Sequence, residues 1–160
     1  MSGLIGDSRQ WADYKDTYTY DLTGNRLQKT TDEGNDSSID RVIDSIFDAN
    51  DRLLTETDTV GSDVTETTYE YDHTQQIEKT VEFNTALKST TQFTWDVMGR
   101  LKVATVTIYT SGVASKIEKT TYGYDEQGIR VSALAETDAN ADSTFETRVL
   151  TKFLADKENH

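Results

Sequence analysis

The chain has 160 residues, of which 29 are acidic and 16 basic, so its formal net charge is −13 and its pI is near 4.4. Such a surface repels nucleic-acid phosphates and anionic lipid headgroups, and we expect neither nucleic-acid binding nor membrane insertion. Cysteine is absent, which excludes disulfides and thiolate metal sites, and a hydrophobic content of 34% predicts a thin sheet with one covered face rather than a closed core.

Residues 1–15 precede the first recognisable repeat and are expected to form a leader segment. The start of the chain lacks the basic and apolar regions of a signal peptide. No stretch of sequence approaches the ~20 apolar residues that a transmembrane helix needs. Residues 16–160 are expected to form an array of about six hairpin repeats.

A short motif recurs through residues 16–160, in which an aromatic or apolar residue precedes an aspartate. Glycine and arginine usually follow, and successive aspartates are 24–31 residues apart, with a degraded sixth copy ending at Asp156. This self-similarity is typical of repeat architectures, in which no single unit can bury its own apolar face. The residues that define the five better copies are Tyr20, Asp21, Gly24, Arg26, Asp48, Tyr71, Asp72, Trp95, Asp96, Gly99, Arg100, Tyr124, Asp125, Gly128 and Arg130.

The segments between the motifs alternate in polarity with a period of two, which indicates β-strands. Residues 67–71 and 101–109 show this pattern clearly, and threonine, tyrosine and valine favour a pleated surface. Residues 38–46 could also be read as a short turn of helix, but a strand that runs into the second motif is the preferred interpretation. We therefore predict an all-β fold of repeated antiparallel hairpins, which form a twisted ribbon or an open sheet.

The motif aspartates are predicted to close the hairpin turns. An aspartate at the first position of a tight turn can accept hydrogen bonds from backbone N–H groups two or three residues later. The glycine three residues after Asp21, Asp96 and Asp125 would supply the positive φ that the turn requires.

Two copies of the motif depart from this pattern. Asp51 takes the place of the glycine after Asp48, which is tolerable because aspartate accepts left-handed geometry. Gln75 and Gln76 replace glycine and arginine after Asp72, so this hairpin is expected to be looser than the others.

One acidic loop offers candidate calcium ligands. Asp138, Asn140, Asp142 and Glu146 place side-chain oxygens at positions one, three, five and nine, as a calcium loop does. The glycine expected at position six and the glutamate expected at position twelve are missing, so a solvated acidic loop is the alternative. Residues 32–40 are a similar but poorer match.

These motifs resemble the YD repeats of bacterial rearrangement-hotspot (Rhs) proteins, wall-associated proteins, insecticidal toxin-complex shells and animal teneurins. The resemblance covers about residues 18–156. It implies a long β-ribbon that spirals into a hollow shell, which encloses a toxic C-terminal domain in the bacterial members and forms a cell-surface scaffold in teneurins. It also implies a secreted or cell-surface location and neighbouring repeats as partners.

Three hypotheses about function follow. The first is a structural shell segment that encloses or displays a C-terminal effector, without catalytic residues or cofactor. The alternative is an envelope-associated β module that binds glycan or calcium. The third is a hydrolase that uses carboxylates such as Asp72 or Asp125, although a catalytic pair need occur only once in a protein. Because the isolated array would have two unpaired sheet edges, we also expect self-association.

Overall fold

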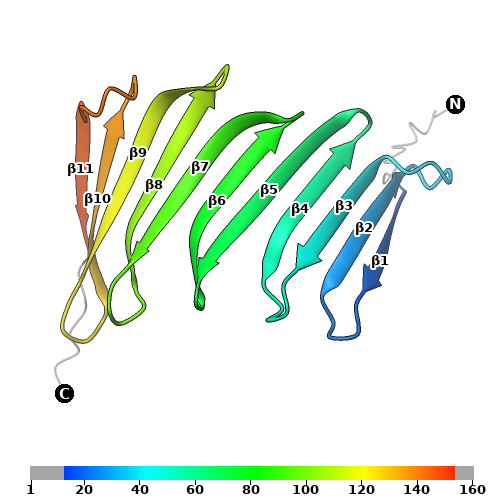
Figure 1. Cartoon of the computed structure of the whole chain (residues 1–160), viewed down its shortest axis with the longest axis horizontal. Helices are drawn as coiled ribbons and strands as arrows, with labels where there is room; N and C mark the ends of the chain where they lie inside the picture. The colour runs from blue at the N-terminus through cyan, green and yellow to red at the C-terminus, as the bar shows by residue number, and fades with distance from the viewer. Residues whose placement is uncertain (1–12, 154–160) are drawn as a thin grey trace, which may run out of the picture. The chain divides into compact units, whose positions relative to one another are not determined.

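The computed structural model describes residues 13–153 (Figure 1). This part of the chain contains strands and no helix, which confirms the predicted all-β fold of antiparallel hairpins. The described residues accordingly include no helix that is long and apolar enough to cross a lipid bilayer. The strands are β1 (Tyr14–Tyr20), β2 (Arg26–Glu33), β3 (Arg41–Phe47), β4 (Leu53–Val60), β5 (Asp63–Asp72), β6 (Gln75–Phe83), β7 (Ala86–Trp95), β8 (Leu101–Thr110), β9 (Val113–Tyr124), β10 (Arg130–Asp138) and β11 (Thr147–Lys152).

The chain divides into two units, residues 1–64 and 65–160. In the first unit β1, β2, β3 and β4 pair in chain order, each antiparallel to the next. The second unit holds β5, except for its first two residues, and β6 to β11, which also pair in chain order. The expected array of repeats is therefore distributed over both units.

The sequence motif marks one end of each hairpin. Odd-numbered strands lead into a motif aspartate and even-numbered strands return from it, so in the second unit the turns after β5, β7 and β9 lie at the same end of the sheet (Figure 1). Residues 38–46 run into β3, which begins at Arg41, so the strand interpretation of this segment is confirmed. β1 begins at Tyr14, two residues before the expected start of the array. Residues 1–12 of the predicted leader and Asp156 of the sixth motif lie outside the described residues.

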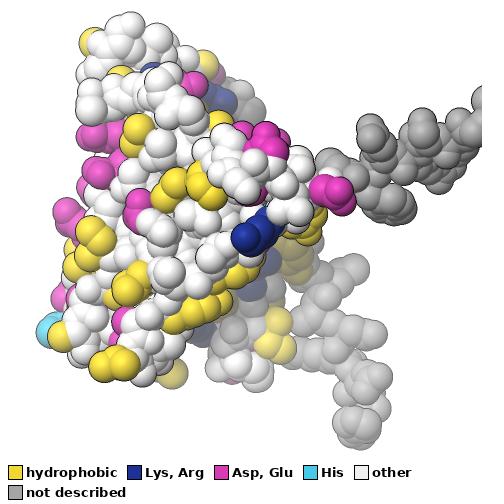
Figure 2. All heavy atoms as spheres, turned by 90° about the vertical axis from the view of Figure 1, so that its right-hand side faces the viewer, with side chains coloured by type: hydrophobic (Ala, Val, Ile, Leu, Met, Phe, Trp, Pro, Cys, Tyr) yellow, Lys and Arg dark blue, Asp and Glu magenta, His cyan; other side chains and the backbone are white. Residues whose placement is uncertain are grey.

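Among residues 13–153 no hydrophobic side chain is buried. Figure 2 shows hydrophobic side chains dispersed over the visible surface, with acidic side chains among them. The side chains that are buried here are polar, namely Asp32, Ser45, Glu136 and Asp138. Stability must therefore come from backbone pairing, from half-buried cross-strand contacts and from these few polar groups.

Candidate functional site

Four of the five described motif aspartates close the same type of turn. In the hairpin at Asp96, the Oδ1 atom accepts hydrogen bonds from the backbone N–H groups of Met98 (2.9 Å) and Arg100 (3.0 Å). The backbone N–H of Asp96 donates in return to the carbonyl oxygen of Arg100 (2.9 Å). Equivalent bonds form at the other three aspartates, which are Asp21, Asp48 and Asp125. The predicted turn-closing role is confirmed, but the donors stand two and four residues after the aspartate rather than two or three.

The residue three positions after each of these aspartates has a positive φ. Gly24, Gly99 and Gly128 have φ values of 97°, 74° and 83°, and Asp51 has a φ of 60°. The predicted need for left-handed backbone geometry is therefore confirmed at all four turns, including the one without glycine.

The side chain four positions after the aspartate donates a further hydrogen bond to the carboxylate in three of these turns. Arg100 occupies this position after Asp96, and its Nε donates to Asp96 Oδ2 over 2.7 Å; Arg52 and Asp48 form the same pair. Asn25 takes this place in the first hairpin, and its Nδ2 donates to Asp21 Oδ2 over 2.9 Å.

Two motif arginines stand one position later in the sequence and bind partners outside their own turns. Arg26 follows Asp21 by five residues and pairs across the sheet with Glu56, at 3.5 Å between Nη2 and Oε2. Arg130 follows its aspartate by the same interval, and its guanidinium lies 5.3 Å from the ring centre of Tyr122 and 5.1 Å from that of Phe153. Arg26 on β2 therefore reaches past β3 to β4, whereas Arg130 contacts aromatic rings on either side of β10, and neither arginine closes a turn.

We expect the stability of the chain to fall as the pH drops from about 4 to about 2. The Asn25 amide is the main cause of the lowering of the Asp21 pKa from 3.8 to about 2. Hydrogen bonds from the Arg52 side chain and from the Arg100 backbone likewise lower the pKa values of Asp48 and Asp96. A carboxyl with a lowered folded-state pKa contributes stability that is complete above its unfolded pKa and is lost as the pH falls through the folded value. Thermal melts across this range would measure the loss.

Asp21→Asn is the control for this pH dependence. Its melting temperature should decline less steeply between about pH 4 and about pH 2, because one of the titrating groups has been removed. Parallel curves for the variant and the parent chain would contradict the assignment of this effect to Asp21.

The hairpin at Asp72 differs from the prediction of a looser turn. Asp72 pairs directly with Gln75, so only His73 and Thr74 lie between β5 and β6. His73 has a φ of 52° and supplies the left-handed residue of this turn. The loss of the glycine and arginine therefore accompanies a shorter hairpin rather than a looser one. The Asp72 side chain is exposed at the end of β5 and does not reproduce the turn bonds described above.

Two motif aromatics of the second unit, Trp95 and Tyr124, bind the preceding hairpin. The indole Nε1 of Trp95 donates to the carbonyl oxygen of Gln76 over 2.8 Å, and the hydroxyl of Tyr124 donates to the carbonyl oxygen of Leu101 over 2.8 Å. The Arg100 guanidinium lies 4.7 Å from the ring centre of Tyr124. These contacts favour a packing role for the motif aromatics over a ligand-stacking platform.

The predicted calcium loop is built around a buried carboxylate. Asp138 ends β10 with 0% of its surface exposed. Its Oδ2 accepts from the backbone N–H of Ser143 (2.7 Å), and its Oδ1 accepts from those of Asn140 (3.2 Å) and Asp142 (3.3 Å). Glu146 closes the loop, because its Oε2 accepts from the backbone N–H of Ala139 (2.9 Å). The Asp138 carboxylate is thus the acceptor around which the loop backbone is organised.

The loop between β2 and β3 has the same design, as the similarity of residues 32–40 to the Asp138 loop suggested. Asp32 is buried and accepts from the backbone N–H groups of Asp36 and Ser37, at the positions of Asp142 and Ser143. The last residue of each loop, Asp40 or Glu146, accepts from the residue that follows the buried aspartate. The similarity is visible in the sequence. Each loop begins with Asp, continues after three residues with Asp-Ser and then Ser or Thr, and ends one residue later with Asp or Glu.

One of these loops brings carboxylates together closely enough to suggest a cation site. Asp138, Asp142 and Glu146 each have an oxygen within 4.8 Å of those of the other two, and in residues 13–153 no other group of three or more acidic or histidine side chains meets this condition. Asn140 lies in the same loop, and its Nδ2 donates to Asp142 Oδ2 over 3.1 Å. The backbone of Thr144 is the main cause of a lowered Asp142 pKa. Hard cations such as Ca²⁺ prefer oxygen ligands of this kind.

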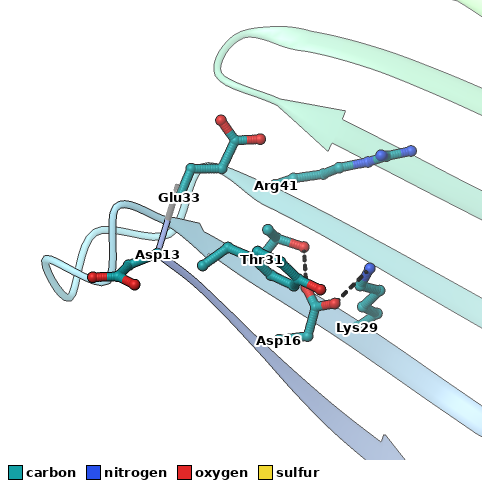
Figure 3. Close-up of a pocket in the computed structure, with 7 residues that line it drawn as sticks. Asp13, Asp16, Lys29, Thr31, Glu33 and Arg41 are labelled. Atoms are coloured by element: carbon teal, nitrogen blue, oxygen red, sulfur yellow. Dashed lines mark hydrogen bonds and ion pairs between the residues drawn. The ribbon is translucent and has the colours of Figure 1, made fainter. Parts of the chain in front are cut away.

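A cavity in the first unit combines acidic and basic side chains (Figure 3). Asp16 on β1 accepts from the hydroxyl of Thr31 (2.7 Å) and pairs with Lys29 Nζ (3.0 Å) on β2. Arg41 extends away from this cluster (Figure 3), and its Nε donates to Asp58 Oδ1 over 2.8 Å. The cations that line the cavity are therefore already paired with carboxylates.

A second cavity of about 350 Å³ lies next to the short Asp72 hairpin. It is lined by Tyr71, Phe93, Trp95 and Leu101, together with Thr74, Gln75 and Gln76. The indole N–H of Trp95, one of the lining residues, is engaged by the carbonyl oxygen of Gln76.

Comparison with known protein families and with curated proteins finds no match to this sequence. The functional conclusion therefore depends on the geometry of the turns, loops and sheet described above.

Proposed function

We propose that this chain is a structural segment of a YD-repeat shell, which encloses or displays a C-terminal effector in a secreted or cell-surface protein of the polymorphic-toxin type. The observation that carries the proposal is the repeated use of one motif for one task. Asp21, Asp48, Asp96 and Asp125 each hold two backbone N–H groups in separate turns. A reaction would call for one specialised carboxylate pair rather than a recurring turn.

The sheet itself supports a wall function. Each described motif returns the chain to pair with the preceding strand, so repeats can be added without a change in design. The high acidic content would keep such a wall soluble despite its exposed hydrophobic side chains. We propose no reaction and no cofactor for this segment.

The native reading frame that contains this chain provides the test. The proposal expects an effector domain of unrelated sequence on the C-terminal side of further repeats. In the purified native polypeptide, that domain should resist protease until the repeat region is cleaved. A native polypeptide without any such domain, or an effector as sensitive to protease with the repeats as without them, would contradict the proposal.

Calcium binding at the Asp138 loop is a second candidate function, favoured by the mutual approach of Asp138, Asp142 and Glu146. We expect a dissociation constant of about 1 mM, because the loop lacks the bidentate glutamate of tighter sites. Calcium at about 10 mM should raise the melting temperature of the second unit by about 5 °C. Calorimetry with calcium would check the affinity directly.

Two controls separate specific binding from screening of the net negative charge. Magnesium at the same ionic strength should give a smaller shift, because it demands stricter octahedral geometry. Asp142→Asn with Glu146→Gln should abolish the calcium-specific shift, while Asp36→Asn with Asp40→Asn in the matched loop should leave it intact. Equal shifts with both metals, or with both double variants, would exclude this candidate.

A further inference from the structure

We infer that the β11 edge of one copy of this chain pairs with the β1 edge of a second copy, in a head-to-tail contact. Within the described residues, β1 and β11 each have only one neighbouring strand, β2 and β10 respectively. This inference goes beyond the proposed shell function, in which further repeats would pair with the same edges, and it concerns the pairing of the 160-residue chain with itself. An unpaired strand edge is a template for another strand, and the occupant can be identified from the residues at each edge.

The backbone of β11 offers hydrogen-bonding groups at alternate residues. The N–H of Phe153 donates to the carbonyl oxygen of Val131 over 2.9 Å, and Leu150 pairs with Leu134 in the same register. In an antiparallel pair the groups of successive residues point alternately toward and away from the partner strand. The N–H and C=O groups of Arg148, Leu150 and Lys152 therefore point away from β10.

The same reasoning defines the free groups of β1. The N–H of Gly34 donates to the carbonyl oxygen of Asp13, and Tyr18 pairs with Lys29 in register with that bond. The backbone groups of Tyr14, Asp16 and Tyr18 therefore point away from β2. The two edges are similar in length, because β1 has seven residues and β11 has six.

Charge selects between the ways of pairing these edges. All six residues of β11 are exposed, and the strand carries Arg148 and Lys152 in an acidic protein. Arg148 pairs with Glu136 on β10, at 3.0 Å between Nε and Oε1, whereas Lys152 lies at the outer end of the strand. If two β11 strands paired with Leu150 opposite Leu150, Arg148 would lie opposite Lys152 twice. Like charges directly opposite each other are destabilising, so the symmetric β11 pair is disfavoured.

The β1 edge complements β11 without such a conflict. An antiparallel register that sets Leu150 opposite Tyr18 of a second copy also sets Lys152 opposite Asp16 and Arg148 opposite Tyr20. Leu150 is 56% exposed and Tyr18 43%, so both have apolar surface to bury. Asp16 already contacts Lys29, Thr31 and the hydroxyl of Tyr18, but its two carboxylate oxygens offer about four acceptor sites and can also accept from Lys152. Edge lysines usually deter pairing, but here the opposing strand supplies an acid.

The inference predicts that the full chain associates reversibly, with a weak interface at high micromolar concentration. Sedimentation velocity on the full chain up to about 1 mM should show species that grow with concentration beyond a dimer, because each added copy leaves one edge of each kind free. Lys152→Glu should weaken association by about fivefold, since it would place two acids opposite each other. A chain that stays monomeric throughout this range overturns the inference.

Two proline variants test which edges meet. Leu150→Pro and Tyr18→Pro each remove an N–H that points away from the parent sheet, so the internal pairing should be retained. Each variant alone should be monomeric, whereas an equimolar mixture should form a dimer through the edge that each has kept. Circular dichroism would verify that both variants are folded. If either proline variant unfolds, Leu150→Lys and Tyr18→Lys replace them, because each adds charge at one edge without removing a backbone donor.

Two outcomes contradict the head-to-tail contact. Self-association of Leu150→Pro alone would show a β1 pair, and self-association of Tyr18→Pro alone would show a β11 pair. A mixture that remains monomeric while the parent chain associates would place the contact elsewhere on the surface.

Discussion

Replacing Asp138 by alanine is expected to lower the free energy of unfolding of the second unit by about 2–4 kcal/mol. The side chain is 0% exposed, and its two oxygens accept from the backbone N–H groups of Asn140, Asp142 and Ser143. Alanine would leave these donors without their acceptor and would remove the centre of the loop that joins β10 to β11. Urea unfolding monitored by circular dichroism would measure the change.

Matched substitutions make this prediction specific. Asp32→Ala should give a loss of similar size in the first unit, because Asp32 holds the equivalent loop. Asp40→Ala should cost less, because that carboxylate is exposed and accepts from the single backbone N–H of Glu33. A change below about 0.5 kcal/mol for Asp138→Ala would mean that the loop does not depend on its buried carboxylate.

Gly99→Val is expected to destabilise the second unit by about 2 kcal/mol. Gly99 has a φ of 74°, and a Cβ at this position would lie 3.0 Å from Nε2 of Gln75. A β-branched residue is poorly suited to left-handed geometry, and the neighbouring glutamine would also have to move. Thermal or urea unfolding would report the loss.

Gly99→Asn is the control, and it should lower the free energy of unfolding by about half as much as Gly99→Val or less. The equivalent position in the second hairpin is already occupied by Asp51 with a φ of 60°, which shows that a short polar side chain can adopt this geometry within the same turn. If the valine and asparagine variants lose the same free energy of unfolding, the left-handed backbone conformation would not explain the loss. The contact of the added Cβ with Gln75 would then be its main cause.

The positions of the turns could be predicted from the sequence because each turn is local. Asp96 and Gly99 lie within four residues of one another, so the carboxylate acceptor and the positive φ can be recognised without knowledge of the rest of the fold. The strand at β3 was predictable for a similar reason, since the segment runs directly into the motif at Asp48. The candidate ligands of the Asp138 loop likewise lie close together in the sequence, and three of them do approach one another.

Features that depend on register or on distant partners were not predictable in the same way. The short Asp72 hairpin requires His73 in a left-handed conformation, and histidine gives a weaker signal for this than glycine does. Arg26 and Arg130 stand one position later than Arg52 and Arg100 relative to their aspartates. That single step changes their partners from the turn carboxylate to Glu56 and to the Tyr122 and Phe153 rings.

The lack of any buried hydrophobic side chain between residues 13 and 153 has a thermodynamic consequence. The heat-capacity increment of unfolding arises mainly from hydration of newly exposed apolar groups, and a chain that covers them only partly should have a smaller increment than a closed-core domain of its length. Its stability curve should then be shallower, with enthalpy and entropy of unfolding that vary less with temperature. A protein of this kind should lose less stability on cooling than a closed-core domain, because the hydrophobic contribution that fades in the cold is smaller.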